Sequence, residues 1–175
     1  MTASEPLFRR ILGTRFDQLP VALQRVHESR TAGRFSGRCD IIRGESWAAR
    51  ILAYMAALPH PGDDVAIGVD IVCELGDETW TRRFGRNLMQ SRLTERHGRL
   101  VERLGPVRLT FVLEIVEGTI VWTIVNAHVL GVRLPLSWFR KVTAKEAVEA
   151  GRYTFDVRAE LPRVGLLIHY RGWLE

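Results

Sequence analysis

The sequence predicts an α+β domain in which N-terminal helices pack on a long, strongly curved antiparallel sheet. Apolar residues recur at helical spacing near the N-terminus, whereas beyond residue 64 they alternate with polar residues at period two. Turn dipeptides, most of them with a glycine, separate the alternating segments. This order indicates a meander of about eight to ten strands, for which a half-barrel gripping a helix is our first expectation and a closed, lipocalin-like barrel the second.

The length of 175 residues fits one domain. We expect it to be helical over residues 1–30, to hold a strand and a helix over 36–58, and to form antiparallel sheet over 64–175. No apolar run reaches the roughly 18 residues of a membrane span, and no leader pattern is evident, so a cytoplasmic protein is expected. Cys39 and Cys73 stand alone, as reduced thiols commonly do.

The chain carries a formal net charge of +5, from 25 basic and 20 acidic residues. The basic residues are spread along the chain and mixed with acidic ones. A nucleic-acid-binding protein more often shows a clustered basic face, so no nucleic-acid partner is expected.

Helix signals occur in three places. Ser4 can cap a helix over residues 5–14, and Pro20 suits the start of a second helix that runs through Val26. A polar link over residues 30–37 and a short strand over 38–43 follow. Ser46 can then cap a helix reaching Leu58, and its apolar stripe is expected to pack on the sheet: Trp47, Ile51, Tyr54, Met55 and Leu58.

The longest hairpin signal spans residues 107–130, with Glu117-Gly118 as its two-residue turn. Counting outward from that turn pairs Leu113 with Trp122 and Phe111 with Ile124. The same count places Asn126 and His128 at the polar end of the apolar face.

Three further hairpins have predicted registers. A Gly76-Asp77 turn pairs Asp70 with Arg83 and turns Arg82 toward the apolar side, where a guanidinium requires a carboxylate, a carbonyl or a ligand. Around His97-Gly98, a two-residue loop would set two arginines opposite each other, so a longer loop that pairs Leu93 with Leu100 is preferred. A Pro162-Arg163 turn sets Phe155 against Tyr170, with Asp156 and His169 together on the other face.

Several segments resemble one bacterial family, catalogued as domain of unknown function 4166. They are LFRRILGTRFDQLP near the start, ETWTRRFG at residues 78–85, GP at 105–106, LGVRLP at 130–135, and GRYTFDV followed by GLLIHYRGWL near the end. The resemblance covers nearly the whole chain. It implies a bacterial domain that is sometimes fused to a nicotinamide-dependent, saccharopine-dehydrogenase-like reductase, and it assigns no catalytic residue.

The candidate ligand-binding residues are the aromatic and polar side chains expected on the apolar face: Trp80, Arg82, Phe84, Phe111, Trp122, Asn126, His128 and Tyr170. An apolar connection supplies a lid or partner contact: Leu134, Leu136, Trp138 and Phe139. We predict no metal and no cofactor, because the histidines lack metal-site spacing and no dinucleotide fingerprint occurs.

These features favour a non-catalytic domain that binds an apolar or amphipathic small molecule in the concavity of the sheet. An interaction module that docks a reductase is the alternative. An enzyme using Asp156 and His169 as a proton-transfer pair ranks third, because no nucleophile with a recognisable motif accompanies them.

Overall fold

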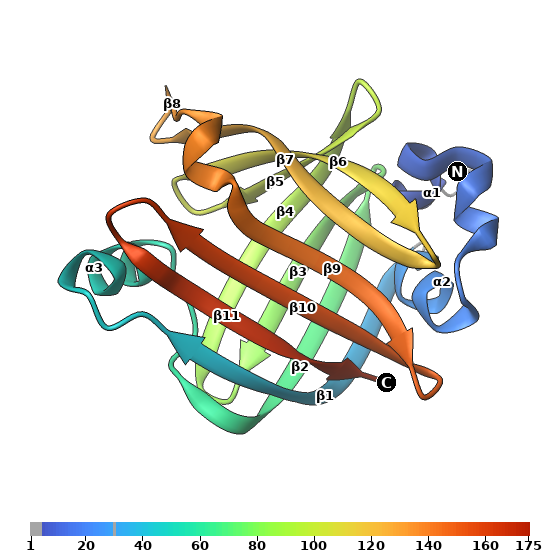
Figure 1. The fold of residues 1–175 in the computed structure, drawn as a ribbon. Helices are drawn as coiled ribbons and strands as arrows, with labels where there is room; N and C mark the ends of the chain where they lie inside the picture. Colours follow the sequence, from blue (N-terminus) through green and yellow to red (C-terminus); the bar gives the residue numbers. More distant parts are fainter. Residues whose placement is uncertain (1–4, 30) are drawn as a thin grey trace.

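The computed structural model describes residues 5–29 and 31–175, in which a closed antiparallel barrel is the main feature (Figure 1). Eleven strands are hydrogen-bonded in one sheet, and because β8 pairs only with β7, ten of them form the ring. The strands are β1 Ala32–Arg43, β2 Gly62–Glu74, β3 Asp77–Phe84, β4 Asn87–Arg96, β5 Arg99–Leu104, β6 Val107–Val116, β7 Thr119–Val129, β8 Val132–Arg133, β9 Lys141–Glu149, β10 Arg152–Leu161 and β11 Gly165–Leu174.

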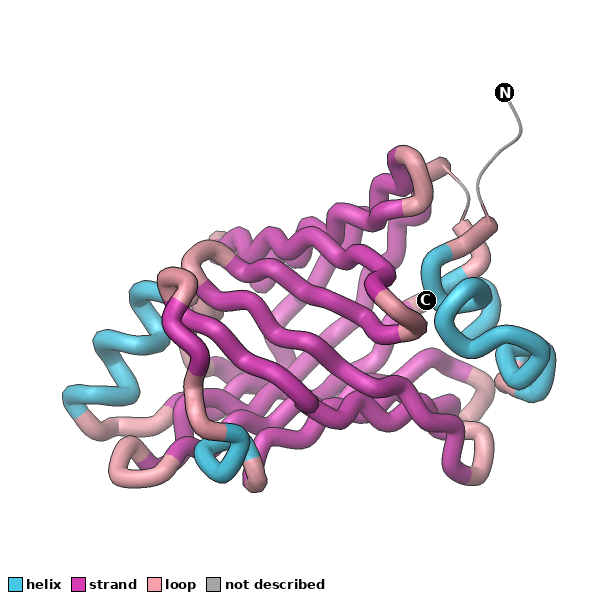
Figure 2. The backbone as a smooth tube through the Cα atoms, turned by 90° about the horizontal axis from the view of Figure 1, so that it is seen from above, coloured by secondary structure: helices cyan, strands magenta, loops and turns pink. Residues whose placement is uncertain are grey.

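The pairing of β1 with β11 closes the ring, because it joins the first strand of the meander to the last. The expected meander order is confirmed, but the half-barrel gripping a helix is wrong. Closure pairs both edges of the long sheet, which an open half-barrel would leave as unpaired backbone groups. The helices consequently lie at the two ends of the barrel (Figure 2).

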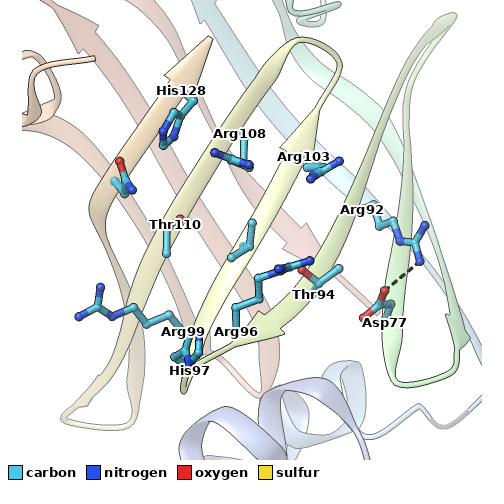
Figure 3. Close-up of a pocket in the computed structure, with 12 residues that line it drawn as sticks. Asp77, Arg92, Thr94, Arg96, His97, Arg99, Arg103, Arg108, Thr110 and His128 are labelled. Carbon is cyan, nitrogen blue, oxygen red and sulfur yellow. Dashed lines mark hydrogen bonds and ion pairs between the residues drawn. The ribbon is translucent and has the colours of Figure 1, made fainter. Parts of the chain in front are cut away.

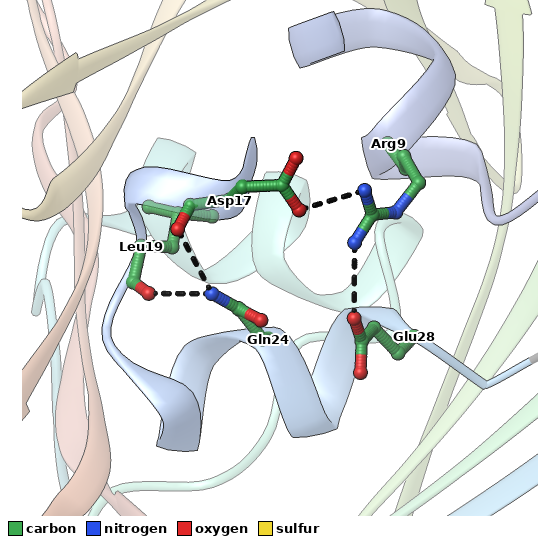
Figure 4. Close-up of polar contacts among 5 residues, drawn as sticks. All are labelled: Arg9, Asp17, Leu19, Gln24 and Glu28. Atoms are coloured by element: carbon green, nitrogen blue, oxygen red, sulfur yellow. Dashed lines mark hydrogen bonds and ion pairs between the residues drawn. The ribbon is translucent and has the colours of Figure 1, made fainter. Parts of the chain in front are cut away.

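Three short helices cover one end: α1 Leu7–Leu12, the 3-10 helix η1 Gly13–Gln18, and α2 Val21–His27. Their apolar side chains point into the barrel and are buried: Leu7, Phe8, Leu12, Phe16, Leu23 and Val26. Arg9 ties the three helices together, since its guanidinium donates to Asp17 at 2.8 Å and to Glu28 at 3.1 Å (Figure 4). The expected Ser4 cap lies outside the described residues, and the first helix is shorter than predicted.

Helix α3 (Trp47–Met55) lies at the opposite end (Figure 1). Its predicted cap is confirmed, because Ser46 Oγ accepts a hydrogen bond from the backbone N–H of Ala49 at 3.1 Å. The predicted packing stripe is confirmed only at its C-terminal end, where Met55 faces the barrel interior and Leu58 packs against the core. Trp47 and Tyr54 are 76% and 87% exposed, because the helix buries its small residues instead. These small side chains allow close approach to the barrel, which leaves Trp47 and Tyr54 outside.

The segment predicted as a polar link, residues 30–37, belongs to β1 from Ala32 onward. The sequence gives no clear strand signal here, because glycines and short polar residues interrupt the apolar pattern. Tertiary pairing on both sides makes it a strand: Ala32 lies opposite Val72 in β2, and Gly37 lies opposite Leu174 in β11.

The central hairpin has the predicted Glu117-Gly118 turn, with φ of 50° and 76°, and the predicted Leu113–Trp122 and Phe111–Ile124 pairs. Beyond them the register shifts, because Thr110 lies opposite Asn126 rather than Val125. This bulge in β7 reverses the faces of the residues that follow. Asn126 and His128 therefore point outward, contrary to the prediction, while Ala127 and Val129 face the interior.

The hairpins β2–β3 and β10–β11 are both shifted by two residues from the predicted registers. Asp70 lies opposite Thr81 and Val69 lies opposite Arg82, because the turn is Leu75-Gly76. In the C-terminal hairpin, Tyr170 lies opposite Val157 instead of Phe155. A shift by two preserves the face of every side chain, so Arg82 still points inward as predicted.

The β4–β5 hairpin has the two-residue His97-Gly98 loop, and the preferred longer loop is wrong. Both loop residues have positive φ, 54° and 71°, as the tight hairpin turn requires. Arg96 consequently lies opposite Arg99 and Leu93 lies opposite Glu102.

Candidate binding cavity

The barrel encloses an apolar cavity of about 450 Å³. Every ring strand except β1 contributes side chains to the lining of this cavity, and most of these side chains are aliphatic or aromatic. The innermost walls include Trp80, Phe111, Trp122, Tyr153 and Phe155, all of which are buried. The volume lies within the roughly 300–1,000 Å³ typical of small-molecule sites.

The cavity extends to the end of the barrel where α3 and the 3-10 helix η2 (Leu136–Phe139) lie (Figure 2). Met55 from α3 and Trp138 from η2 both line it, and both are 46% exposed. Leu134 and Phe139 line it as well, while Leu136 does not. Two apolar segments far apart in the sequence thus frame the mouth.

Arg82 enters the cavity wall with its charge already balanced. Its guanidinium donates to Ser91 Oγ at 2.9 Å and lies 3.5 Å from a carboxylate oxygen of Glu102. It also lies over the Trp80 ring, 4.9 Å from the centroid. The side chain is 11% exposed, so this paired arrangement is what its burial requires.

A second polar group lies deeper, where α2 meets the barrel. His27 and Glu146 share a hydrogen bond of 2.7 Å, and both residues are buried. Glu78 accepts from the Trp80 indole N–H at 2.8 Å. Burial raises the pKa of Glu78, against the opposing effects of that indole and of His27.

The two tyrosines of the cavity stay neutral. Burial raises the pKa of Tyr170 to about 12, and burial together with the Glu146 charge holds the pKa of Tyr153 well above its ordinary value. The interior therefore presents hydroxyl groups rather than additional charge.

Trp122 presents an unused hydrogen-bond donor. Its ring packs between Phe8 and Phe111, with centroids 5.7 and 5.3 Å away. Its buried indole Nε1 has no hydrogen-bond partner among the described residues. A buried donor without a partner is costly, and a molecule in the cavity could supply the acceptor.

Most of the predicted ligand-binding residues come together here. Trp80, Arg82, Phe111, Trp122 and Tyr170 line the cavity. Phe84 lies behind this wall in edge contact with Tyr170, at 5.6 Å between centroids. Asn126 and His128 line a hollow on the outside instead.

The carboxylate expected beside Arg82 is confirmed as Glu102, but sequence reasoning missed Glu146 and the histidine of the interior. Glu146 occupies an inward position of a strand that otherwise alternates regularly, and this alternation could have located it. His27 lies at the end of α2, where a histidine is often solvent-accessible, but it is 1% exposed. Only its partner on a distant strand explains that burial.

The candidate thiol nucleophiles and the predicted Asp156–His169 pair lie on different faces of the barrel wall. Burial raises the pKa of the Cys39 thiol to about 12 and that of Cys73 to about 11, so neither is a ready thiolate. Asp156 and His169 form the predicted surface pair at 3.0 Å, on the outer face of the sheet. Among the described residues, no three His, Cys, Asp or Glu side chains are placed to hold a metal ion.

The fold and the cavity define the structural class of the protein, which is a closed antiparallel β-barrel with a hollow apolar interior and helices at both ends. The chain belongs to the family described as "Domain of unknown function (DUF4166)", whose model matches residues 19–174. A comparison with curated proteins finds no match. In the described part of the chain, no helix is long and apolar enough to cross a bilayer.

Proposed function

We propose that the barrel binds an apolar or amphipathic small molecule in its interior. The observation that carries this proposal is the cavity of about 450 Å³ behind Trp138 and Met55. A packed protein core leaves few voids larger than a water molecule. An apolar hollow of this size therefore favours an occupant other than side chains.

The polar groups narrow the chemistry of that occupant. The Arg82 charge is balanced by Glu102, and the Glu146 carboxylate is bonded to His27, so neither calls for an oppositely charged ligand. Of the buried side-chain groups without a hydrogen-bond partner in the described structure, the indole N–H of Trp122 is the one that belongs to the cavity lining. An apolar molecule with one hydrogen-bond acceptor, such as a carbonyl or a hydroxyl oxygen, fits these walls best.

A pair of matched substitutions on β9 tests the proposal. Ala144 lines the cavity opposite Trp122, and Ala147, three residues further on, faces outward. The probe is N-phenyl-1-naphthylamine, a neutral fluorophore that charged groups on the outer surface would not attract. We expect the parent and Ala147→Phe to bind it, and Ala144→Phe to bind at least about tenfold more weakly, which corresponds to about 1.4 kcal/mol.

Two outcomes of the fluorophore titration would contradict the proposal. A parent protein that leaves the fluorescence unchanged would contradict an accessible apolar interior. Equal affinity of the Ala144→Phe and Ala147→Phe variants would place the probe elsewhere on the molecule.

A further inference from the structure

A second concavity lies on the outer face of strands β4 to β7 (Figure 3). It is a hollow of about 690 Å³, and its lining has the opposite strand alternation from that of the interior cavity. The lining includes five arginines and two histidines but one carboxylate, Asp77, which already pairs with Arg92 at 2.9 Å.

Within this hollow, arginines and a histidine from neighbouring strands occupy positions directly opposite one another. Arg92 pairs in register with Arg103, Arg103 with Arg108, and Arg108 with His128. The register continues from His128 to Arg133 on β8. We call these five residues the cationic row; Figure 3 shows its first four members side by side across the strands.

Such a row opposes folding unless an anion balances it. Like charges directly opposite each other on adjacent strands are destabilising. Among the described residues, Arg103, Arg108 and Arg133 have no carboxylate within 4.0 Å, whereas Arg34 on β1 and Arg83 on β3 both pair with Asp70 on β2. The contrast indicates that a counter-charge from outside the chain completes the row.

The geometry of the row selects the kind of anion. Neighbouring strands lie about 4.8 Å apart, so the five positions form a line about 19 Å long. Guanidinium groups bind phosphate through paired hydrogen bonds. A chain of linked phosphate groups would place successive charges along this line.

Other polyanions fit less well. An acidic protein surface would need an apolar centre, yet Val101 is the one aliphatic residue of the lining. Single-stranded nucleic acid would need aromatic platforms for its bases, and the lining has no Phe, Tyr or Trp. We propose that the cationic row is a binding site for an oligophosphate chain, whether inorganic or the phosphate tail of a nucleotide.

The test is calorimetric titration of the full chain with sodium tripolyphosphate, ATP and a thymidine oligonucleotide, at low and high salt. Arg103→Gln and Arg108→Gln each remove one charge from the row. Arg25→Gln removes one exposed charge from α2, at the end of the barrel where the N-terminal helices lie, and serves as the matched control. We expect each row variant to weaken tripolyphosphate binding at least about tenfold, and the control to change it less than about twofold.

Comparing tripolyphosphate with ATP distinguishes an inorganic oligophosphate from the phosphate tail of a nucleotide. Similar affinity for tripolyphosphate and ATP would show that phosphates alone are read, while tighter binding of ATP would assign the site to a nucleotide. Binding should also weaken as salt increases.

Two results would overturn the proposal: equal effects of the row variants and the Arg25 control, or a preference for the oligonucleotide over both phosphate compounds. Thermal unfolding without ligand checks that the variants fold. Because repulsion is relieved, Arg103→Gln should melt no lower than the parent.

Discussion

The two ends of the barrel are both capped by helical segments, but they are packed in opposite ways. At the N-terminal end, α1 and α2 insert large side chains that become fully buried, such as Phe8 and Leu23. At the other end, α3 contacts the barrel through Ala49 and Ala53, and its Trp47 and Tyr54 are exposed. One end is therefore a core, and the other is a mouth that leaves the interior hollow.

Phe8→Ala should cause the largest loss of stability, because this ring belongs to the closed end. It is 0% exposed and stacks on His27 with 3.7 Å between centroids. Removing a fully packed phenylalanine costs about 3–5 kcal/mol through lost burial and a residual void. Urea unfolding would measure it, and a loss below about 1 kcal/mol would mean that the end is loosely packed.

Trp122→Ala should cost less than Phe8→Ala, although the tryptophan is larger. One part of its surface faces the cavity, so less packing is lost than in a filled core. The same substitution should weaken binding of N-phenyl-1-naphthylamine. A stability loss equal to or above that of Phe8→Ala, together with unchanged binding, would show that the ring belongs to a solid core.

Glu78→Gln tests the electrostatics of the closed end. Burial raises the folded-state pKa of Glu78, so the folded protein takes up its proton more readily than the unfolded chain. This group therefore contributes stability below the unfolded pKa of about 4.3, and that contribution is lost as the pH rises through the folded value. Glutamine stays neutral and can still accept from the Trp80 indole.

The stability of Glu78→Gln relative to the parent should accordingly increase from acidic to neutral pH. Urea midpoints at several pH values would measure this difference. A difference that does not vary with pH would mean that the carboxyl is not desolvated as the structure indicates.

Trp138→Ala should have the smallest effect on stability, below about 1 kcal/mol, because the ring is half-exposed at the mouth. It should nevertheless change the rate at which the fluorophore enters and leaves. Stopped-flow fluorescence would compare it with Leu136→Ala, which alters the same 3-10 helix outside the cavity lining. Identical exchange rates in both variants would argue against this mouth as the route of entry.

The sequence predicts the strands and most of their faces, because alternation at period two is a local signal. It does not predict register, which depends on where each turn lies. An error of two residues left Arg82 on its correct face, whereas the single extra residue at Val125 moved Asn126 and His128 to the opposite one. Barrel closure and the partner of His27 depend on contacts between distant strands, which no local pattern records.

The alignment of the arginines on the outer face also depends on strand register and was therefore not predictable from the sequence. In the sequence they are dispersed among acidic residues, and the β4–β5 register that aligns them is disfavoured because it sets like charges opposite each other. The structure adopts that register, with Arg92 opposite Arg103 and Arg96 opposite Arg99. The rule that like charges on adjacent strands are destabilising therefore predicts the wrong register for the strands that carry the cationic row.

The most direct test of the hollow interior is a crystal structure of the protein soaked with 11-bromo-1-undecanol, located by the anomalous scattering of bromine. The alcohol is neutral, so the cationic row should not attract it. We expect a bromine peak inside the barrel, with the alkyl chain of the alcohol between α3 and Trp122. An interior filled by side chains, or a bromine peak only on the outer surface, would contradict this expectation.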